Sequence, residues 1–121
     1  MLTNKELSKQ IIEYLNANKT ETGDALYAIQ GDLSRSGKYY NSWLVLTMTH
    51  IISYDGEFLK YRIDELKSIQ IRRMYGNAAL FVNLKDNDSK CFFRYTYSVS
   101  VICDALVDYI NHIKNGADSA I

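Results

Sequence analysis

The chain has 121 residues, a length that suits one domain. Hydrophobic residues make up 47% of it and charged residues 23%, as in an ordinary globular protein, which excludes a largely disordered chain. The 14 basic and 14 acidic side chains cancel, which argues against a nucleic-acid-binding protein that neutralises phosphates.

A helix is predicted over residues 3 to 17. Thr3 and Glu6 have the spacing of a capping box, in which each side chain binds the backbone amide of the other residue. Apolar residues recur there at helical spacing and form one stripe, made of Leu7, Ile11, Ile12 and Leu15. This stripe is expected to lie either on the rest of the domain or on a partner. Residues 16 to 25 are polar, contain Gly23 and are predicted to form a loop.

Seven short β-like runs follow, separated by turn signals. The runs are residues 26–33, 42–49, 50–55, 58–63, 68–74, 78–84 and 89–95. Asp55-Gly56 predicts a hairpin, because glycine supplies the positive φ of a type I′ turn; Gly76-Asn77 and residues 86 to 89 are predicted turns as well. No helix-length segment separates the runs, so the pattern favours an antiparallel sandwich or barrel over parallel βαβ units.

A second amphipathic helix is predicted over residues 98 to 114, with Ser98 as its N-cap and Gly116 beyond its end. Its apolar face comprises Val99, Ile102, Leu106, Tyr109, Ile110 and Ile113, and its polar face Asp104, Asp108, Asn111 and Lys114. A helix, seven antiparallel strands and a helix is the order of the pleckstrin-homology superfold. The predicted class is therefore α+β, mainly β: a bent seven-stranded antiparallel sheet or partial barrel capped by the C-terminal helix, with an extra N-terminal helix.

The predicted division of the chain follows from these elements. Residues 1–25 form the N-terminal helix and linker, residues 26–115 the pleckstrin-homology-like domain, and residues 116–121 a tail. Residues 1 to 20 carry two glutamates and lack a long apolar core, which argues against a signal peptide. No run approaches the roughly 20 apolar residues of a membrane span, so a cytoplasmic location is expected.

The run 42–49 contains the single tryptophan, Trp43. Its side chains alternate between two faces, with Trp43, Val45 and Thr47 on one and Leu44, Leu46 and Met48 on the other. Both faces are apolar, so one is expected to lie under the N-terminal helix or to meet a partner. Trp43 is accordingly a candidate core residue or, alternatively, an exposed interaction anchor.

Arg35 and Lys38, in the loop after the first strand, are the candidates for a weak anion or lipid contact. Arg94, Lys60 and Arg62 are further candidate cations that would assist this contact. A phosphorylated head group needs several convergent cations, so specific phosphoinositide binding is not expected.

Enzyme chemistry has little support in the residues. His50 and His112 lie in different predicted elements, and neither belongs to a metal-binding or phosphate-binding motif. Asp86 and Asp88 lack the glycine and glutamate of a calcium loop and are interpreted as a turn. Cys91 and Cys103 are interpreted as buried thiols in a reducing compartment. We predict no catalytic residue, no cofactor and no metal.

The central segment resembles the pleckstrin-homology-like region that precedes the membrane domain of certain bacterial ABC exporters. The matching positions are Gly31, Asp32, Leu33, Gly37, Tyr39, Ser42, Trp43, Leu44, Val45, Leu46 and Thr47, and further on Tyr61, Asp64, Ile69 and Gly76. Members of that family continue into transmembrane helices and an ATP-hydrolysing domain, which these 121 residues do not contain.

The resemblance implies a non-catalytic cytoplasmic interaction or regulatory module at the inner face of the membrane. Its partners would be other domains or subunits of the exporter or another protein, with the membrane only indirectly involved, no nucleic acid, and a weak homodimer if an apolar patch is uncovered. The alternative is a free-standing adaptor of the same fold that binds a peptide or a membrane surface. A small enzyme or ligand carrier would need convergent polar groups in an apolar pocket, and no such set is visible in the sequence.

Overall fold

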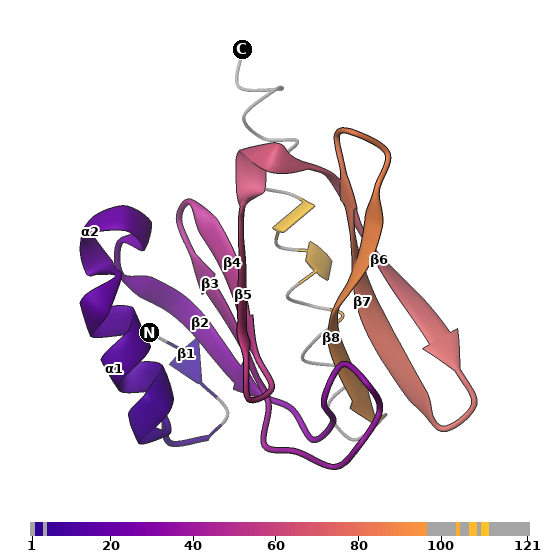
Figure 1. Ribbon diagram of the computed structural model, residues 1–121, viewed down its shortest axis with the longest axis horizontal. Coiled ribbons are helices and arrows are strands. Elements are labelled where there is room, and N and C mark those ends of the chain that lie inside the picture. The colour runs from indigo at the N-terminus through magenta and orange to yellow at the C-terminus, as the bar shows by residue number, and fades with distance from the viewer. Residues whose placement is uncertain (1, 4, 97–103, 105–106, 109, 112–121) are drawn as a thin grey trace.

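The structure is a computed structural model that describes residues 2–3, 5–96, 104, 107–108 and 110–111. The fold is mainly β, as predicted. Its strands form two sheets, one of five strands and one of three, in which all pairs but one are antiparallel. Within the described residues the two sheets do not close into a barrel. Figure 1 shows them side by side, with the helices α1 and α2 beside the first sheet.

The first sheet has the strand order β1-β2-β3-β4-β5. Its strands are β1 (Leu2–Thr3), β2 (Ala25–Gln30), β3 (Trp43–Thr47), β4 (His50–Tyr54) and β5 (Phe58–Arg62). A short 3-10 turn, Ile63–Glu65, leads into the second sheet, whose order is β6-β7-β8. These strands are β6 (Leu66–Met74), β7 (Asn77–Leu84) and β8 (Ser89–Thr96). Each of the seven predicted runs therefore overlaps one of the strands β2 to β8.

The Asp55-Gly56 hairpin forms, but its turn is wider than predicted. Tyr54 pairs with Phe58, so the loop has three residues, and only Gly56 among them has a positive φ. A type I′ turn would require two consecutive residues with positive φ. Asp55 instead keeps a negative φ and directs its carboxylate toward a distant arginine.

The start of the N-terminal helix was predicted wrongly. Helix α1 spans Lys9–Ala17 and its N-cap is Ser8, whereas Thr3 belongs to strand β1 and lies opposite Ala28. The Thr3 hydroxyl bonds locally to the carbonyl and amide of Lys5, so no capping box forms with Glu6. Pairing with β2 supplies backbone partners that the helix would otherwise supply. A second short helix, α2 (Lys19–Thr22), lies within the predicted loop 16–25.

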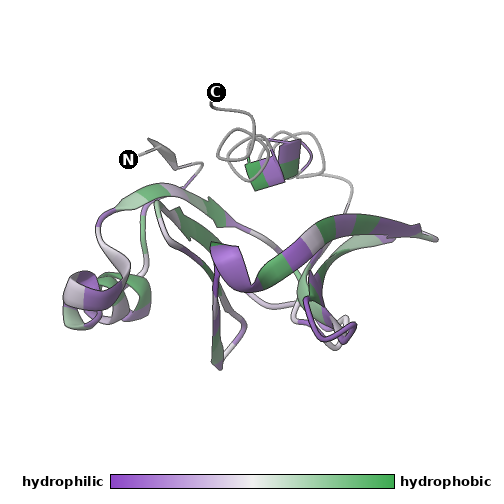
Figure 2. Cartoon of the chain, turned by 90° about the horizontal axis from the view of Figure 1, so that it is seen from above, coloured by the Kyte–Doolittle hydropathy of each residue, from purple (hydrophilic) through white to green (hydrophobic). Residues whose placement is uncertain are grey.

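Two apolar clusters lie on the two faces of the first sheet. The larger one fills the space between the sheets and includes Leu44 and Leu46 of β3. The smaller one lies between α1 and the sheet and includes Ile11, Trp43 and Val45. Figure 2 shows α1 on the side of the first sheet that faces away from the second sheet. Because both faces of β3 are covered, all five of its residues are buried.

The apolar stripe of the N-terminal helix was expected to lie either on the rest of the domain or on a partner. It lies on the chain's own first sheet, where Leu7, Tyr14 and Leu15 pack around the cluster of Ile11 and Trp43. Ile12, which was predicted to belong to the stripe, is 44% exposed. Met48 was predicted to share the face of Leu44 and is also exposed, because β3 ends at Thr47.

The predicted C-terminal helix falls mostly outside the described residues. Its described positions are helical: Asp104, Val107, Asp108, Ile110 and Asn111. Val107 and Ile110 are buried in the cluster between the sheets, and Asp108 is exposed. The predicted caps Ser98 and Gly116, and the positions Val99, Ile102, Leu106, Tyr109, Ile113 and Lys114, lie outside the described residues.

No helix within the described part of the chain has the length and hydrophobicity needed to cross a membrane.

Candidate interaction site

The loop between β2 and β3, residues 31 to 42, connects the two sheets. The Asp32 carboxylate accepts hydrogen bonds from the amide of Thr96, at 2.9 Å, and from its hydroxyl. Leu33 forms an isolated bridge with Arg94 of β8 and another with Tyr39. Figure 1 shows this loop passing from β2 to the end of β8. The Gly-Asp-Leu segment of the resemblance therefore has a structural role in this chain.

Gly31 is required by close packing at this junction. A Cβ atom there would lie 2.5 Å from Cζ of Phe93 and 2.7 Å from Oγ of Ser42. Such distances are shorter than any side chain tolerates without displacement of its neighbours. The glycine thus allows the chain leaving β2 to pass directly over β8.

Arg35 is bound by Asp55 rather than available for an anion. Its Nη2 lies 2.6 Å from Oδ1 of Asp55, and its backbone amide donates to Oδ2 of the same carboxylate at 2.8 Å. Its Nη1 also donates to the Ser53 hydroxyl, at 2.6 Å, and its Nη2 to the carbonyl of Glu57, at 3.0 Å. The Arg35 and Asp55 side chains are only 20% and 14% exposed. This charge-assisted network fixes the loop against the β4–β5 turn.

A surface hollow of about 580 Å³ lies beside this ion pair. We call it the Tyr39 hollow; it is lined by Ser34, Arg35, Ser36, Lys38, Tyr39, Tyr40, Asp55, Gly56 and Glu57. Tyr39 is 88% exposed and Tyr40 39% exposed, although both are large aromatic residues. Two basic and two acidic side chains line the hollow, so it has no net charge.

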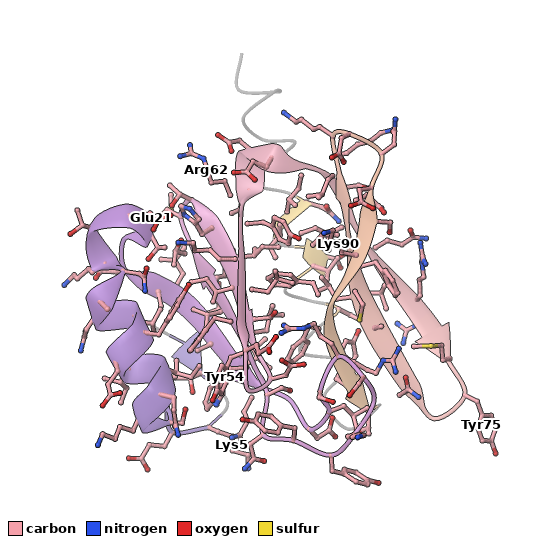
Figure 3. The ribbon with its side chains drawn as sticks, viewed as in Figure 1. Lys5, Glu21, Tyr54, Arg62, Tyr75 and Lys90 are labelled. Carbon is pink, nitrogen blue, oxygen red and sulfur yellow. The ribbon has the colours of Figure 1, made fainter. Side chains whose placement is uncertain are left out.

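Aromatic rings continue from the Tyr39 hollow to helix α1. Tyr40 lies edge-on to Tyr54, with ring centroids 6.1 Å apart, and their hydroxyl oxygens are 3.4 Å apart. Tyr54 packs against Phe58 at 4.4 Å, and Phe58 stacks on Tyr14 of α1 at 3.8 Å. Tyr54 is labelled beside α1 in Figure 3. The rings support Tyr40 from behind and hold it at the surface.

The other candidate cations for the anion contact do not all lie near the Tyr39 hollow. Lys38 lies in the lining of the hollow and is exposed. Arg94 reaches the loop, since a Cβ on Gly37 would lie 2.8 Å from its Nη1. Lys60 instead pairs with Glu21 at 2.7 Å, and Arg62 with Asp64 at 3.0 Å. Figure 3 places Arg62 far from Tyr54, near the opposite end of the first sheet.

Trp43, the remaining predicted site residue, is 1% exposed and lies in the cluster under α1. Its ring is therefore part of the core and has no surface for a partner.

Asp55, Glu57 and the two adjacent tyrosines, Tyr39 and Tyr40, were not predicted as site residues. The pair Tyr39-Tyr40 beside a glycine turn was the available signal, because large aromatics are uncommon in exposed loops.

A second polar cluster surrounds His50, beneath α2. The Oγ1 of Thr49 lies 2.7 Å from Nδ1 of His50, and Nε2 lies 3.8 Å from Oε1 of Glu21. A hydroxyl, an imidazole and a carboxylate in this order suggest a nucleophile with its base. The imidazole, however, is only 3% exposed, which leaves no room for a substrate to share its proton. The cluster is better explained as the attachment of α2 to the sheet.

The free energy of unfolding is expected to decrease as the pH is lowered, because of His50. Burial lowers the pKa of His50 below its usual 6.5, Glu21 opposes this effect, and Lys60 and Arg62 add to it. The unfolded chain therefore binds the proton more tightly than the folded chain, so stability declines as pH drops from about 6.5 toward the folded pKa. Denaturant unfolding of wild type and His50→Gln at about pH 7.5 and pH 5 measures this. An equal loss of stability in the two proteins would show that His50 is not responsible.

Cys91 is a partly buried free thiol, and burial raises its pKa, which lowers its reactivity. Cys103 and His112 lie outside the described residues. The described part of the chain contains no group of three or more His, Cys, Asp or Glu side chains that could hold a metal ion. Asp86 and Asp88 belong to the β7–β8 turn, which is closed by a bond from the Leu84 amide to the Asp88 carbonyl at 2.8 Å.

No protein-family model matches the chain, and no curated protein matches it significantly.

Proposed function

We propose that the chain is a non-catalytic interaction module whose Tyr39 hollow binds a segment of a protein partner. The observation that supports this most is the exposure of Tyr39, at 88%, beside a hollow with polar walls. Tyrosine is enriched at protein interfaces because it offers a large rigid surface together with a hydroxyl. Tyr40 is held at the rim by the ring of Tyr54, which reduces the entropy lost on binding.

A protein segment suits the hollow better than a phosphorylated head group. Asp55 already neutralises Arg35, and Glu57 offsets Lys38, so an incoming phosphate would meet no excess positive charge. Phosphate sites rely on several cations with free N–H groups directed at the ligand. A hollow without net charge, lined by tyrosines, serine hydroxyls and side chains of both signs, favours a peptide with mixed polar and apolar side chains.

The finer assignment is that the fold is pleckstrin-homology-like and that the module belongs to an ABC-type exporter. Four antiparallel strands followed by three, with helical residues Val107 and Ile110 buried between the sheets, support the fold. The ordered matches from Gly31 to Gly76 support the exporter. In that context the hollow would bind another domain or subunit of the transporter, at the inner face of the cell membrane. A free-standing adaptor with the same fold would use the same hollow.

Peptide selection tests the binding role. A displayed peptide library is selected on the chain, and the Kd of the best peptide is measured by calorimetry. Tyr39→Ala is expected to weaken binding about tenfold or more, as loss of an aromatic anchor does. Tyr75→Ala is the matched control, because Tyr75 is fully exposed on a different turn and should not affect the Kd. Failure to select any peptide, or equal effects of both variants, would refute the role assigned to the hollow.

Reading the gene beyond the codon for Ile121 tests the exporter assignment separately. Several apolar spans of about 20 residues and then a phosphate-binding loop are expected. An immediate stop codon would exclude the exporter and leave the free-standing adaptor.

A further inference from the structure

The β4–β5 turn contains a chemically reactive dipeptide, Asp55-Gly56. Glycine has no Cβ atom, so its amide nitrogen approaches the carboxyl carbon of a preceding aspartate with little steric hindrance. Gly56 is exposed, and its amide donates no hydrogen bond within the part of the chain that the structure describes. The nitrogen that acts as the nucleophile is therefore free to react.

The reaction of such a dipeptide is isomerisation through a cyclic imide. The Gly56 nitrogen attacks Cγ of Asp55: a Cγ–N bond forms, one Cγ–O bond breaks, and this oxygen leaves as water with the amide proton and a proton from solvent. Water then adds to one of the two imide carbonyls. Addition at the main-chain carbonyl of Asp55 breaks its bond to the Gly56 nitrogen and leaves isoaspartate. Water is the only co-reactant, and no group is oxidised or reduced.

The Asp55 carboxylate is held in the folded chain by hydrogen bonds to both of its oxygens. Oδ1 lies 2.6 Å from Nη2 of Arg35, and Oδ2 accepts a hydrogen bond from the Arg35 amide at 2.8 Å. The Asp55 side chain is only 14% exposed. Loss of one oxygen as water therefore requires that a charge-assisted hydrogen bond be broken first, in a place that admits little solvent.

The same arginine fixes the turn on both sides of Gly56. Its Nη1 donates to the Ser53 hydroxyl at 2.6 Å, and its Nη2 to the Glu57 carbonyl at 3.0 Å. The Asp55 amide donates to that carbonyl as well, at 3.3 Å. Ring closure requires the backbone of Asp55 to rotate until the Gly56 nitrogen faces Cγ, which would disturb these bonds. The dipeptide is therefore expected to react only after the turn opens locally.

We propose that Asp55-Gly56 is a site of spontaneous aspartate isomerisation and that Arg35 protects it in the folded chain. In isoaspartate the main chain is one carbon longer and the carboxylate is attached directly to Cα. Such a residue would not place its two oxygens on the amide and the guanidinium of Arg35 as Asp55 does. Isomerisation would thus detach the loop 31–42 from the β4–β5 turn and remove one wall of the Tyr39 hollow.

Tyr40 is the other side chain over this dipeptide. A Cβ atom on Gly56 would lie 3.5 Å from its hydroxyl oxygen. This hydroxyl, however, is bonded to that of Tyr54, at 3.4 Å, and does not hold the Asp55 carboxylate. Tyr40 covers the glycine from one side, whereas Arg35 restrains the reacting carboxyl group itself. The protection is therefore assigned to Arg35.

The test is a chemical measurement on the whole chain and does not depend on any binding partner. Wild type and Arg35→Ala are incubated at body temperature and neutral pH, and samples are digested with trypsin over several weeks. Isoaspartate is separated from aspartate in the peptide of residues 39–60 by chromatography and identified by electron-transfer fragmentation. Arg35→Ala is expected to isomerise at Asp55 at least about tenfold faster than wild type, because charge-assisted hydrogen bonds no longer oppose the opening. A synthetic peptide of residues 51–60 gives the rate of the unprotected dipeptide.

Two variants separate the effect of Arg35 from coverage and from global unfolding. Tyr40→Ala uncovers Gly56 but keeps the ion pair, and should isomerise at the wild-type rate. Val82→Ala creates a cavity in the second sheet, where Val82 is fully buried, and lowers overall stability without touching the ion pair. It should isomerise more slowly than Arg35→Ala.

The outcomes that would overturn the proposal are equally specific. Wild type would isomerise as fast as the synthetic peptide if the fold gave no protection. An Arg35→Ala rate equal to that of wild type would show that the arginine has no part in it. Rates of Tyr40→Ala or Val82→Ala as high as that of Arg35→Ala would assign the protection to coverage or to global stability instead.

Discussion

Replacing Trp43 by alanine is expected to lower the free energy of unfolding by about 3–5 kcal/mol. The indole is 1% exposed and lies in a cluster with Ile11 of α1 and with Val45 and Ile52 of the sheet. Its removal leaves a cavity beneath the helix that one short helix cannot fill by shifting. The indole N–H has no hydrogen-bond partner in the described residues, so the loss is one of apolar packing.

Urea unfolding followed by circular dichroism measures this loss, since the variant has no tryptophan to report by fluorescence. Tyr75→Ala removes a comparably large ring from a fully exposed position and should change stability by less than about 0.5 kcal/mol. A Trp43→Ala loss as small as that of Tyr75→Ala would mean that α1 does not cover this face of the sheet in solution.

Replacing Asp55 by alanine is the second change with a large expected effect, a loss of about 2–4 kcal/mol. Asp55 binds both the guanidinium and the backbone amide of Arg35, and its removal leaves a largely buried cation without its counter-charge. The loop 31–42 would then lose its main attachment to the β4–β5 turn. We expect peptide binding in the Tyr39 hollow to weaken in parallel, because Tyr39 and Tyr40 lie on that loop.

A double-mutant cycle with Arg35→Ala isolates the pair, and the double variant is expected to be more stable than the sum of the single losses predicts. Asp64→Ala is the matched control, because Asp64 forms a 3.0 Å ion pair with Arg62 at the surface. The Arg62 side chain is 55% exposed and the Asp64 side chain 66% exposed. Exposed pairs contribute less than about 1 kcal/mol. Similar losses in Asp55→Ala and Asp64→Ala would show that burial of the Arg35 pair is unimportant.

The strands could be predicted because their signals are local. The runs carry apolar residues at strand spacing, and the turns after β4, β6 and β7 each contain a residue of positive φ, Gly56, Gly76 and Asn87 respectively. The alternation of Trp43 and Leu44 likewise predicted two covered faces. These properties depend on neighbouring residues, which the sequence displays directly.

The site could be predicted only in part, because its chemistry depends on residues far apart in the sequence. Arg35 was a reasonable candidate for anion binding until its partner, 20 residues away, was located. Glu21 similarly binds Lys60, 39 residues away, on the sheet. A cation's availability is set by the nearest carboxylate in space, and no local pattern identifies that carboxylate.

The sequence by itself determined the approximate positions and the order of strands β2 to β8 and the apolar character of both faces of β3. The tertiary structure alone decided that Thr3 joins a strand, that α1 covers Trp43, and that Asp55 neutralises Arg35. The physical reason is the same in each case. Local periodicity and turn geometry act over a few residues, whereas strand pairing, burial and ion pairing are settled between segments brought together only by folding.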